Sequence, residues 1–465
     1  MDRDERIYKL GREPIGSLLL HYGVPAVVGT MVTALYNIVD RIFIGQGVGE
    51  YAIAGLTLTF PILIFLQAFG MLVGAGAAAR VSILLGQKDT RGAERVLGTA
   101  IVLTLITQAM TIVPSLIWMR PLLEAFGGSE RTIPYAMDYL SITIPGNIFA
   151  TLCFSYNAVM RASGYPRKAM YTMILGAVLN TVLDALFIYV FGWGIAGAAW
   201  ATVVAMLVSA TYVLSHFFSA DSVIRFRREH LRLSWVPMWG IASIGLSPFA
   251  VQLLGSLVSM LFNKSFIAVS PTPEAADIAI GSYGIIVSIA MLGVMLMLGI
   301  AQGMQPIVGY NYGAKLYDRV RETFWRCAWV NISIGFVVTL GSILAPDFIS
   351  SIFTQSPLLL EETSKSLSIA LVGFVFVGFQ ITATQFLQSL GIARRAFLLS
   401  ISRQSLFFIP LLLILPYRYG VDGVWYSGVM ADILSGLLGV ALITWQMKQF
   451  RAQEVRVKEA ASEGL

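Results

Sequence analysis

Long apolar runs, separated by short breaks rich in charged residues, Gly or Pro, restrict what this chain can fold into more than any other feature. A helix needs about 20 apolar residues to cross the hydrocarbon core of a bilayer. A spanning segment must also satisfy its own backbone hydrogen bonds there, so each run predicts a helix. Twelve runs of this kind lie at 15–44, 52–83, 95–118, 134–160, 169–192, 196–219, 239–269, 278–308, 327–345, 365–390, 397–416 and 424–447. The sequence therefore predicts an all-α polytopic membrane protein with twelve transmembrane helices.

The composition excludes the main alternatives. Residues of the AVILMFWYC set make up 57% of the 465 residues, and charged residues make up 12%, which is about half the share of a soluble domain. A disordered chain, a coiled coil and an ordinary soluble enzyme are excluded on that basis. The net charge of +6 is typical of basic cytoplasmic loops, so we expect no nucleic-acid partner. Cys153 and Cys327 stand far apart and the three histidines are scattered, so we expect no disulfide, no metal site and no cofactor.

The basic residues are divided unevenly between the two sides of the predicted bundle. The termini and the breaks after every second run hold 26 of the 32 Lys and Arg residues. The opposite side carries the acidic stretch at 270–277. Because Lys and Arg gather in cytoplasmic loops, both termini are predicted to be cytoplasmic. The N-terminus shows no cleavable signal pattern, so the first run is expected to remain as a transmembrane helix.

The chain also repeats itself at a nearly constant offset of 223 to 227 residues. LGQKD at 85–89 matches YGAKL at 312–316, and GYPRKA at 164–169 matches GIARRA at 391–396. Six runs per half is an even number, so both halves would cross the bilayer in the same orientation. This predicts two six-helix lobes related by a pseudo-two-fold axis along the membrane normal, an arrangement common in transporters. The predicted parts are a first lobe at 1–220, a basic cytoplasmic linker at 221–238, a second lobe at 239–447 and a cytoplasmic tail at 448–465.

Three acids lie well inside the predicted spans: Asp40, Asp184 and Asp432. An ionisable side chain is costly in a bilayer core, and most of those present are functional. Asn180 lies one helical turn from Asp184, and Thr202 lies at a similar depth in the next span. We predict that Asp40, Asn180, Asp184 and Thr202 hold a proton or a small cation such as Na⁺. The structural alternative is that each acid only bonds a neighbouring helix, and we favour that alternative for Asp432.

Candidates for substrate binding and for bending lie near these acids. Tyr36 is one turn from Asp40, and Asn157, Tyr139 and Met173 are weaker candidates; aromatic faces attract organic cations and Met adapts to varied shapes. Most Met and aromatic residues of the spans are nevertheless expected to face lipid or pack between helices. Pro25 lies in the middle of the first span, where a proline permits a kink. It is the better hinge candidate, with a static kink as the alternative.

The two halves differ in their acids. The repeat offsets place Asn263 opposite Asp40, Leu411 opposite Asp184 and Met206 opposite Asp432. A neutral amide cannot change its charge, and a leucine cannot hold an ion. We therefore expect ion coupling in the first half, while the second half mainly shapes the cavity.

Four segments together resemble the multidrug and toxic compound extrusion (MATE) family, and the resemblance covers nearly the whole chain. They are LYNIVDRIFIGQGVG at 35–49, LNTVLDALFIY at 179–189, GIAGAAWAT at 194–202 and QPIVGYNYGAK at 305–315. The resemblance implies a two-lobed fold of six helices each and the export of lipophilic, usually cationic drugs in exchange for protons or sodium. By position, Asp40, Asn180, Asp184 and Thr202 match the first-lobe polar cluster of the DinF-like branch, and Pro25 matches its bending proline. Other motifs look similar to MepA-like members.

This chain departs from the NorM-like pattern, which has acids in the first and fourth helices of the second lobe. Here those helices are predicted at 239–269 and 365–390, and they contain no acid. The departure argues against a second-lobe sodium site of that type.

The sequence thus predicts a secondary-active multidrug efflux antiporter, monomeric and embedded in the bacterial inner membrane. Two alternatives remain open. A lipid-linked oligosaccharide flippase of the same superfamily would be expected to line its central cavity with basic residues, and only Arg403, near a predicted cytoplasmic end, fits that pattern. A membrane-embedded enzyme would need a nucleophile with a base or a metal constellation, and the sequence shows neither motif.

Overall fold

The computed structural model describes residues 3–462, and within that range the chain forms helices and no strand. The first half consists of α1 (Arg3–Tyr8), α2 (Ile15–Gly47), α3 (Glu50–Gly86), α4 (Thr90–Ile117), α5 (Met119–Ala125), α6 (Ile133–Ala162), α7 (Pro166–Asp184) and α8 (Gly194–His216). The second half consists of α9 (Trp235–Val269), α10 (Pro273–Gly313), α11 (Tyr317–Leu344), α12 (Pro346–Ser351), α13 (Pro357–Ala370), α14 (Phe374–Ser389), α15 (Ala393–Ile401) and α16 (Ile409–Ser462).

Two long segments contain a wider π-helical turn. One follows α7 at Ala185–Val190, and the other joins α15 to α16 at Ser402–Phe408. Short 3-10 helices lie at Lys9–Gly11 and Arg228–His230. Because π turns recur at functional sites, the position of the first one directly after Asp184 is notable.

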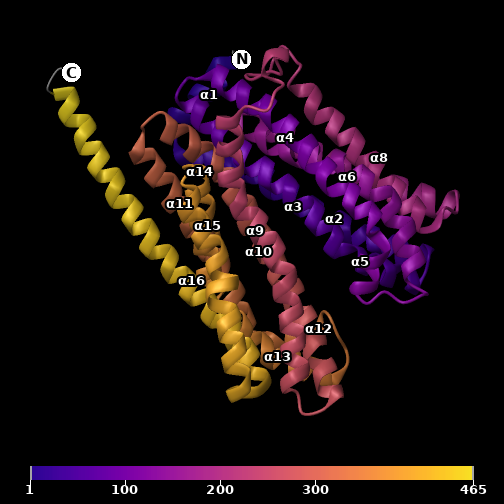
Figure 1. The fold of residues 1–465 in the computed structure, drawn as a ribbon. Coiled ribbons are helices and arrows are strands. Elements are labelled where there is room, and N and C mark those ends of the chain that lie inside the picture. Colours follow the sequence, from indigo (N-terminus) through magenta and orange to yellow (C-terminus); the bar gives the residue numbers. More distant parts are fainter. Residues whose placement is uncertain (1–2, 463–465) are drawn as a thin grey trace.

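The helices supply twelve membrane spans. Among the described residues, nine segments are long and apolar enough to cross a bilayer alone, and α13 with α14 forms one further span with a 53° bend. The segment from α15 into α16 reverses at Gly420, whose φ is 60°, and therefore crosses twice (Figure 1). With α6, which carries too many polar residues to qualify on hydropathy, the total is twelve, as predicted.

The break in the tenth span was not predicted from the sequence, which indicated one continuous helix at 365–390. The structure starts α13 at Pro357 and interrupts the helix between Ala370 and Phe374. A β-carbon at Gly373 would lie 2.9 Å from Cβ of Asp432. The break therefore lets the backbone pass close to the acid of the last span.

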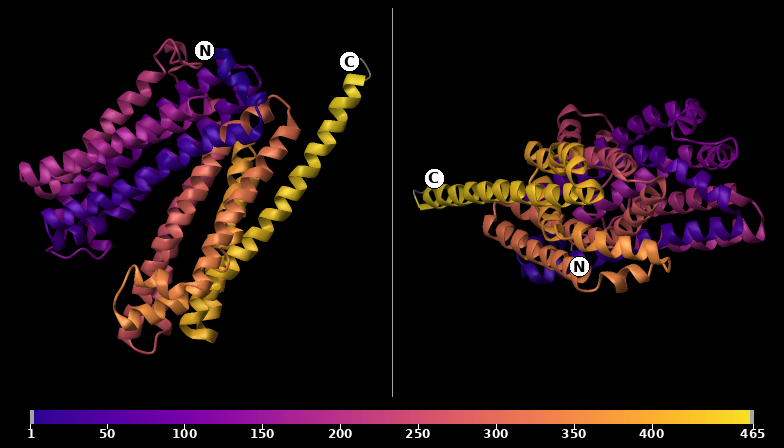
Figure 2. Two further views of the ribbon diagram at one scale, coloured as in Figure 1. Left: turned by 180° about the vertical axis from the view of Figure 1, so that it is seen from behind. Right: turned by 90° about the horizontal axis from the view of Figure 1, so that it is seen from below.

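The twelve spans form two lobes, as Figures 1 and 2 show. The lobes meet at the end that holds both termini and diverge toward the other end. Their contact is made by α3 against α9 and by α2 against α10. Each lobe has its own apolar core, for example around Tyr156 and Phe217 in the first half and around Phe324 and Phe386 in the second.

The backbone confirms the two-fold repeat of the fold class. Lys88 and Lys315, which the sequence repeat pairs, are the two non-glycine residues with positive φ in the described chain, at 62° and 60°. The paired glycines Gly164 and Gly391 also have positive φ, at 98° and 72°. A left-handed conformation is unfavourable for a lysine, so its recurrence at matched positions reflects one inherited turn.

Glycines allow the lobes to touch closely at the closed end. A β-carbon at Gly86 of α3 would overlap the carbonyl oxygen of Tyr310 in α10, and one at Gly313 would overlap the carbonyl oxygen of Ile83. These two contacts are equivalent under the repeat. Only residues without a side chain permit this backbone approach.

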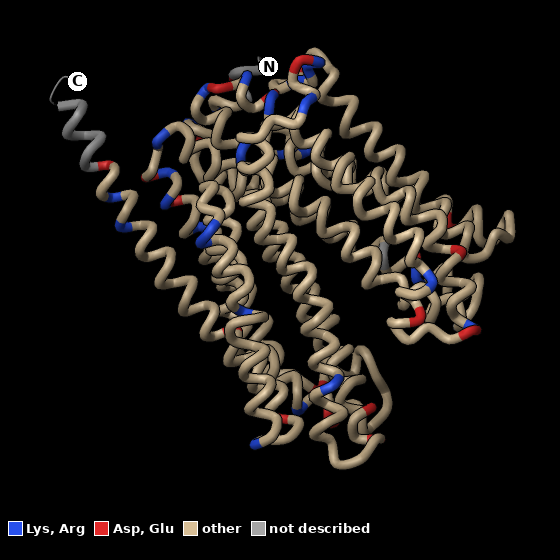
Figure 3. Tube along the Cα trace, in the orientation of Figure 1, with Lys and Arg blue, Asp and Glu red and all other residues tan. Residues whose placement is uncertain are grey.

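Lys and Arg gather at the end of the molecule where the lobes meet, as Figure 3 shows. The linker between α8 and α9 belongs to this end and packs on the first lobe. Arg227 forms an ion pair of 2.5 Å with the buried Glu94 of α4, and the Thr99 hydroxyl donates to the carbonyl oxygen of Arg232. The charge distribution matches the predicted orientation, which itself stays a prediction.

Candidate functional site

Two carboxyl groups meet between α2 and α7. Asp40 lies near the end of α2, and Asp184 is the last residue of α7 and fully buried. Their side chains lie within hydrogen-bonding reach of each other. Within the described chain, no N–H or O–H donor reaches either oxygen of Asp184 or Oδ1 of Asp40. Two facing carboxyl groups can hydrogen bond only when one carries a proton, so the pair is built to share a proton or to hold a cation.

The other predicted ion-coupling residues surround this pair. Asn180, one turn before Asp184, donates from Nδ2 to the Thr202 hydroxyl of α8 at 3.3 Å. Its Oδ1 accepts no hydrogen bond from the described residues. Tyr139 of α6 lies within reach of Thr202 as well. The structure therefore brings Asp40, Asn180, Asp184, Thr202 and Tyr139 together, drawn from four helices.

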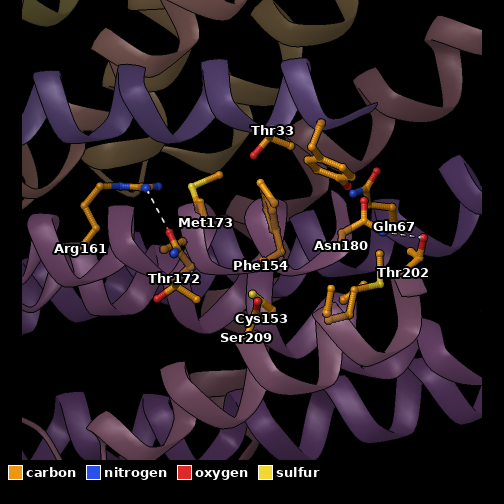
Figure 4. Close-up of a pocket in the computed structure, with 18 of the residues that line it drawn as sticks. Thr33, Gln67, Cys153, Phe154, Arg161, Thr172, Met173, Asn180, Thr202 and Ser209 are labelled. Carbon is orange, nitrogen blue, oxygen red and sulfur yellow. Dashed lines mark hydrogen bonds between the residues drawn. The ribbon is translucent and has the colours of Figure 1, made fainter. Parts of the chain in front are cut away.

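The first lobe contains a cavity of about 140 Å³ (Figure 4). Asn180, Gln67 and Thr202 lie at one end of it, and Arg161 lies at the other. A neighbouring cavity of about 170 Å³ is lined by Asp40 and Tyr139 and shares Tyr36, Gln67 and Thr202 with the first. Since pockets for drug-sized ligands measure about 300–1,000 Å³, the first-lobe cavity has to widen before it accepts one.

The predicted substrate-binding residues fall into two groups. Tyr36 and Tyr139 lie beside the acids, whereas Asn157 and Met173 line the cavity farther along, toward Arg161. The Asn157 amide is engaged: Nδ2 donates to the carbonyl oxygen of Ala169 at 2.6 Å, and Oδ1 accepts from Arg161. The sequence grouped all four with the acids, and the structure corrects this for Asn157 and Met173.

Pro25 is buried inside α2, at the contact between the lobes. A β-carbon at Gly303 of α10 would lie 2.5 Å from Cα of Gly23, and one at Gly299 would lie 2.7 Å from Cα of Val27. The proline thus stands between two residues that touch the second lobe. A bend at this position would move the part of α2 that carries Val27 and Asp40 relative to the part that carries Gly23, and would therefore alter the lobe contact and the position of Asp40 together.

A third cavity, of about 300 Å³, lies between the lobes and is called the inter-lobe cavity here. Its walls include seven glutamines and two arginines, and none of the residues that line it is an acid: Gln252, Gln302, Gln305, Gln380, Gln385, Gln388, Gln404, Arg161 and Arg403. The Arg403 guanidinium pairs with the buried carboxylate of Asp432 across the second lobe.

This pair corrects the expectation for Arg403. The sequence places Arg403 near a cytoplasmic end, but it lies ten residues beyond the start of α15 at Ala393. That is about 15 Å along a helix from the start of α15. Its partner Asp432 is 5% exposed, so each residue compensates the charge of the other within the second lobe.

Sequence reasoning missed Arg161 and the glutamines. The fourth span was predicted to end at 160, so Arg161 was counted with the basic loop that follows. In the structure α6 continues to Ala162 and Arg161 is 6% exposed. A signal was present, because RASGY at 161–165 puts the helix-ending Gly164 several residues after the arginine.

The chain is a transporter of the MatE family. The family's sequence profile matches residues 25–186 and, a second time, residues 248–414, so each half contains one copy of the family domain. Members of this family are transporters and not enzymes, and the chain is accordingly a multi-pass membrane protein of the family.

Several relatives and solved structures are similar over nearly the full length. The multidrug export protein MepA of Staphylococcus haemolyticus is 26% identical over 95% of this chain and 96% of its own length. MepA of Staphylococcus aureus strain NCTC 8325 is 24% identical over the same shares. A MATE transporter solved in a bent conformation has a TM-score of 0.90 at 22% identity, covering 97% of this chain and 99% of that one. A multidrug resistance MATE transporter of the MOP superfamily, solved facing outward, has a TM-score of 0.88, covering 96% and 98%.

Proposed function

We propose that this protein is a secondary-active antiporter that exports lipophilic, cationic compounds across the bacterial inner membrane in exchange for protons or Na⁺. The observation that carries the proposal is the facing pair Asp40 and Asp184: no described donor reaches either oxygen of Asp184 or Oδ1 of Asp40, and Asp40 lines the cavity of about 170 Å³ beside the first-lobe cavity. The naming of the full-length MepA relatives as multidrug export proteins supports the substrate class.

Exchange follows from the charge of the pair. With one or both carboxyl groups ionised, the pair attracts an organic cation, and Tyr36 offers an aromatic face beside it. When a proton or Na⁺ binds between the oxygens of Asp40 and Asp184, the negative charge of the pair falls by one and the attraction for the drug weakens. One site then serves both ligands in turn, and a driving ion that enters displaces the drug.

The coupling ion supplies enough free energy for this exchange. A proton gradient contributes about 1.36 kcal/mol per pH unit, and a membrane potential contributes about 2.3 kcal/mol per 100 mV for each charge. A hundredfold drug gradient costs about 2.7 kcal/mol. For a drug with one positive charge, exit against the potential costs what the entry of one proton gains, so a one-for-one exchange is driven by the pH gradient alone. A hundredfold drug gradient then needs about 2 pH units, or a second proton per drug.

The open side of the molecule fits the release step. The lobes are closed at the end with the termini and diverge at the other (Figure 2). With cytoplasmic termini, as the charge distribution favours, this arrangement faces outward. In that state an incoming ion reaches Asp40 and Asp184 from outside while the drug leaves to the same side.

Vesicles with imposed gradients test the proposal. The purified protein is reconstituted with the lipophilic cation ethidium, and a pH gradient or a Na⁺ gradient is applied, one at a time. We expect ethidium to cross the membrane in the direction opposite to the flow of the driving ion. This movement should stop when the ion gradient is collapsed. Movement of ethidium that ignores both gradients, or no movement at all, would overturn the proposal.

A second candidate, lipid-linked oligosaccharide transport, is favoured by one observation, the two arginines and seven glutamines that line the inter-lobe cavity. Pairing of Arg403 with Asp432 leaves only one of those arginines without an acid partner, which is a weak basic lining. Reconstituted vesicles that contain a fluorescent undecaprenyl-linked sugar separate the two functions. If the protein transfers this lipid between leaflets and does not export ethidium, the second candidate is favoured.

A further inference from the structure

Arg161 is a buried cation without a counter-ion. It is 6% exposed, and its two described hydrogen bonds go to neutral amide oxygens, Oδ1 of Asn157 at 3.4 Å and Oε1 of Gln302 at 3.0 Å. Its Nε has no partner, and no acid of the described chain forms an ion pair with it. Burial of an unpaired charge costs several kcal/mol, on the order of the penalty for one desolvated ion. Such a group is retained where a ligand supplies the missing charge.

The position of Arg161 identifies where that ligand would bind. Arg161 and Gln302 each line both the first-lobe cavity and the inter-lobe cavity, so they stand where the two cavities adjoin. Figure 4 shows the arginine at the end of the first-lobe cavity opposite Asn180 and Thr202. It is the one charged side chain among the residues that line this cavity.

The comparison with Arg403 sharpens the point. Both arginines face the inter-lobe cavity, but Arg403 has its carboxylate, Asp432, inside the second lobe. Arg161 has no equivalent. A guanidinium has five N–H donors, and the hydrogen bonds to Asn157 and Gln302 use two of them, so donors remain for a planar carboxylate, the geometry that Arg binds best.

We propose that Arg161 binds an anionic group, a carboxylate, on the transported molecule. Arg161 would then distinguish molecules that carry a carboxylate from those that do not. This inference rests on the proposed function, because it names a specificity-determining residue of the same cavities. It also assigns the two ends of the first-lobe cavity opposite preferences: carboxylates bind at Arg161, and cationic groups bind toward Asp40 and Asp184.

The competing explanation is structural. Arg161 belongs to the first lobe and Gln302 to the second, so their hydrogen bond also connects the lobes. A purely connecting role affects all substrates alike, whereas a counter-ion role affects only those that carry a carboxylate. Two dyes that differ in a single carboxyl group distinguish these roles.

The test uses rhodamine B, which carries a free carboxylate, and rhodamine B ethyl ester, in which that group is blocked. Binding of each dye to the full-length protein in nanodiscs is measured by fluorescence anisotropy, without any ion gradient. We expect Arg161→Gln to weaken binding of the acid by about ten- to a hundredfold, the loss of a hydrogen bond to a charged group. Binding of the ester should change by less than about twofold, and Arg161→Lys should restore part of the affinity for the acid.

Arg80→Gln is the matched control. Arg80 of α3 also has an unpartnered Nε, and it lies against Gly240 of the second lobe without lining either cavity. Its substitution should leave the affinities for both dyes unchanged. Equal loss of both dyes in Arg161→Gln, unchanged binding of the acid, or no binding of the acid to the unsubstituted protein would each overturn the inference. If the ester alone fails to bind, this result counts against the export of cations. The role of Arg161 is then decided by the binding of the acid.

Discussion

The intramembrane acids differ in what surrounds their carboxyl groups. Asp432 faces a guanidinium, Arg403, and the two charges cancel. Asp40 and Asp184 face each other with no described donor to either oxygen of Asp184. Two like charges in contact cannot both stay ionised without a bound cation. The pair of Asp432 and Arg403 is therefore structural, and the pair of Asp40 and Asp184 is suited to binding and releasing an ion.

Asp40→Asn and Asp184→Asn should each abolish ion-driven efflux. An amide in place of either carboxyl group leaves one acid with no second carboxylate to share a proton or a cation, while the fold keeps a side chain of the same shape. Efflux of ethidium from cells that express equal amounts of each variant measures this. Drug resistance close to that of the unsubstituted protein in either variant would contradict the assignment.

Asp432→Asn should leave ion-driven drug release intact but lower stability. Breaking one partner of a buried ion pair costs about 3–5 kcal/mol, whereas replacing both is close to neutral. We therefore expect the double variant Asp432→Asn/Arg403→Gln to recover most of the thermal stability that Asp432→Asn loses. Thermal unfolding in detergent checks the stability, and titration of ion-dependent release checks the function. A selective loss of the ion response in Asp432→Asn would move the coupling site into the second half.

Sequence patterns located Asp40 and Asp184 because an acid within a long apolar run stands out. The partner of Asp432 did not stand out, because Arg403 lies 29 residues away and its span begins near other basic residues. Arg161 escaped for a related reason: a helix end is uncertain by a few residues, and a one-residue shift turns a buried charge into a loop charge. Pairings and depth depend on tertiary packing, which single-sequence patterns do not contain.

At the scale of elements, α2 joins the coupling site to the lobe contact. Its first half touches α10 at Gly23 and Val27, its second half carries Asp40, and Pro25 lies in the first half between the two contact residues. A proline inside a helix removes a backbone hydrogen bond and lowers the resistance to bending. Sequence indicated this proline directly, but its place in the lobe contact emerged only from the structure.

Pro25→Ala should slow transport more than it weakens drug binding. Alanine restores the helical hydrogen bond and stiffens α2 without removing a ligand, so we expect efflux to fall by about tenfold, equivalent to about 1.4 kcal/mol in the barrier. Affinity and efflux rate for ethidium are measured on one preparation. Pro114→Ala, at the proline inside α4, is the control and should change neither quantity. Parallel loss of affinity and rate in Pro25→Ala would reject the hinge.

The tenth span shows the opposite case, in which sequence failed at the element scale. The run at 365–390 contains no proline and only two isolated glycines, Gly373 and Gly378, and isolated glycines are common in transmembrane helices. The structure bends the span by 53° between α13 and α14, where Gly373 admits the side chain of Asp432. That reason lies in a different helix and cannot be deduced from the local pattern.

At the scale of the whole molecule, the closed end depends on two equivalent glycine contacts. Gly86 lies against the backbone at Tyr310, and Gly313 lies against the backbone at Ile83. These are backbone contacts, so a larger residue cannot be accommodated by turning a side chain. The repeat itself was predicted from sequence, because matched motifs at one offset survive even where pairwise identity is low. The contact between the halves was not.

Gly86→Val and Gly313→Val should each force the closed end open. Overpacking of a tight contact costs about 1–3 kcal/mol, and separation of the lobes relieves it. Double electron–electron resonance between spin labels at the exposed positions Arg91 and Asp318 should then report longer distances. A separate efflux assay should show reduced transport. Gly255→Val, where nothing lies within 4 Å, is the control. Unchanged distances in both variants would show that the closed end does not depend on these contacts.

The parallel relation of the two halves has a consequence for how such a chain enters the membrane. When a six-span unit is fused to its own copy, both copies cross the membrane in the same orientation. Inverted repeats differ, because their two copies cross in opposite orientations. One set of basic loops can therefore orient all twelve spans, and a strong charge bias is no obstacle to gene fusion. Most Lys and Arg residues lie at the end where the lobes meet (Figure 3), which is the charge pattern expected of two copies joined in the same orientation.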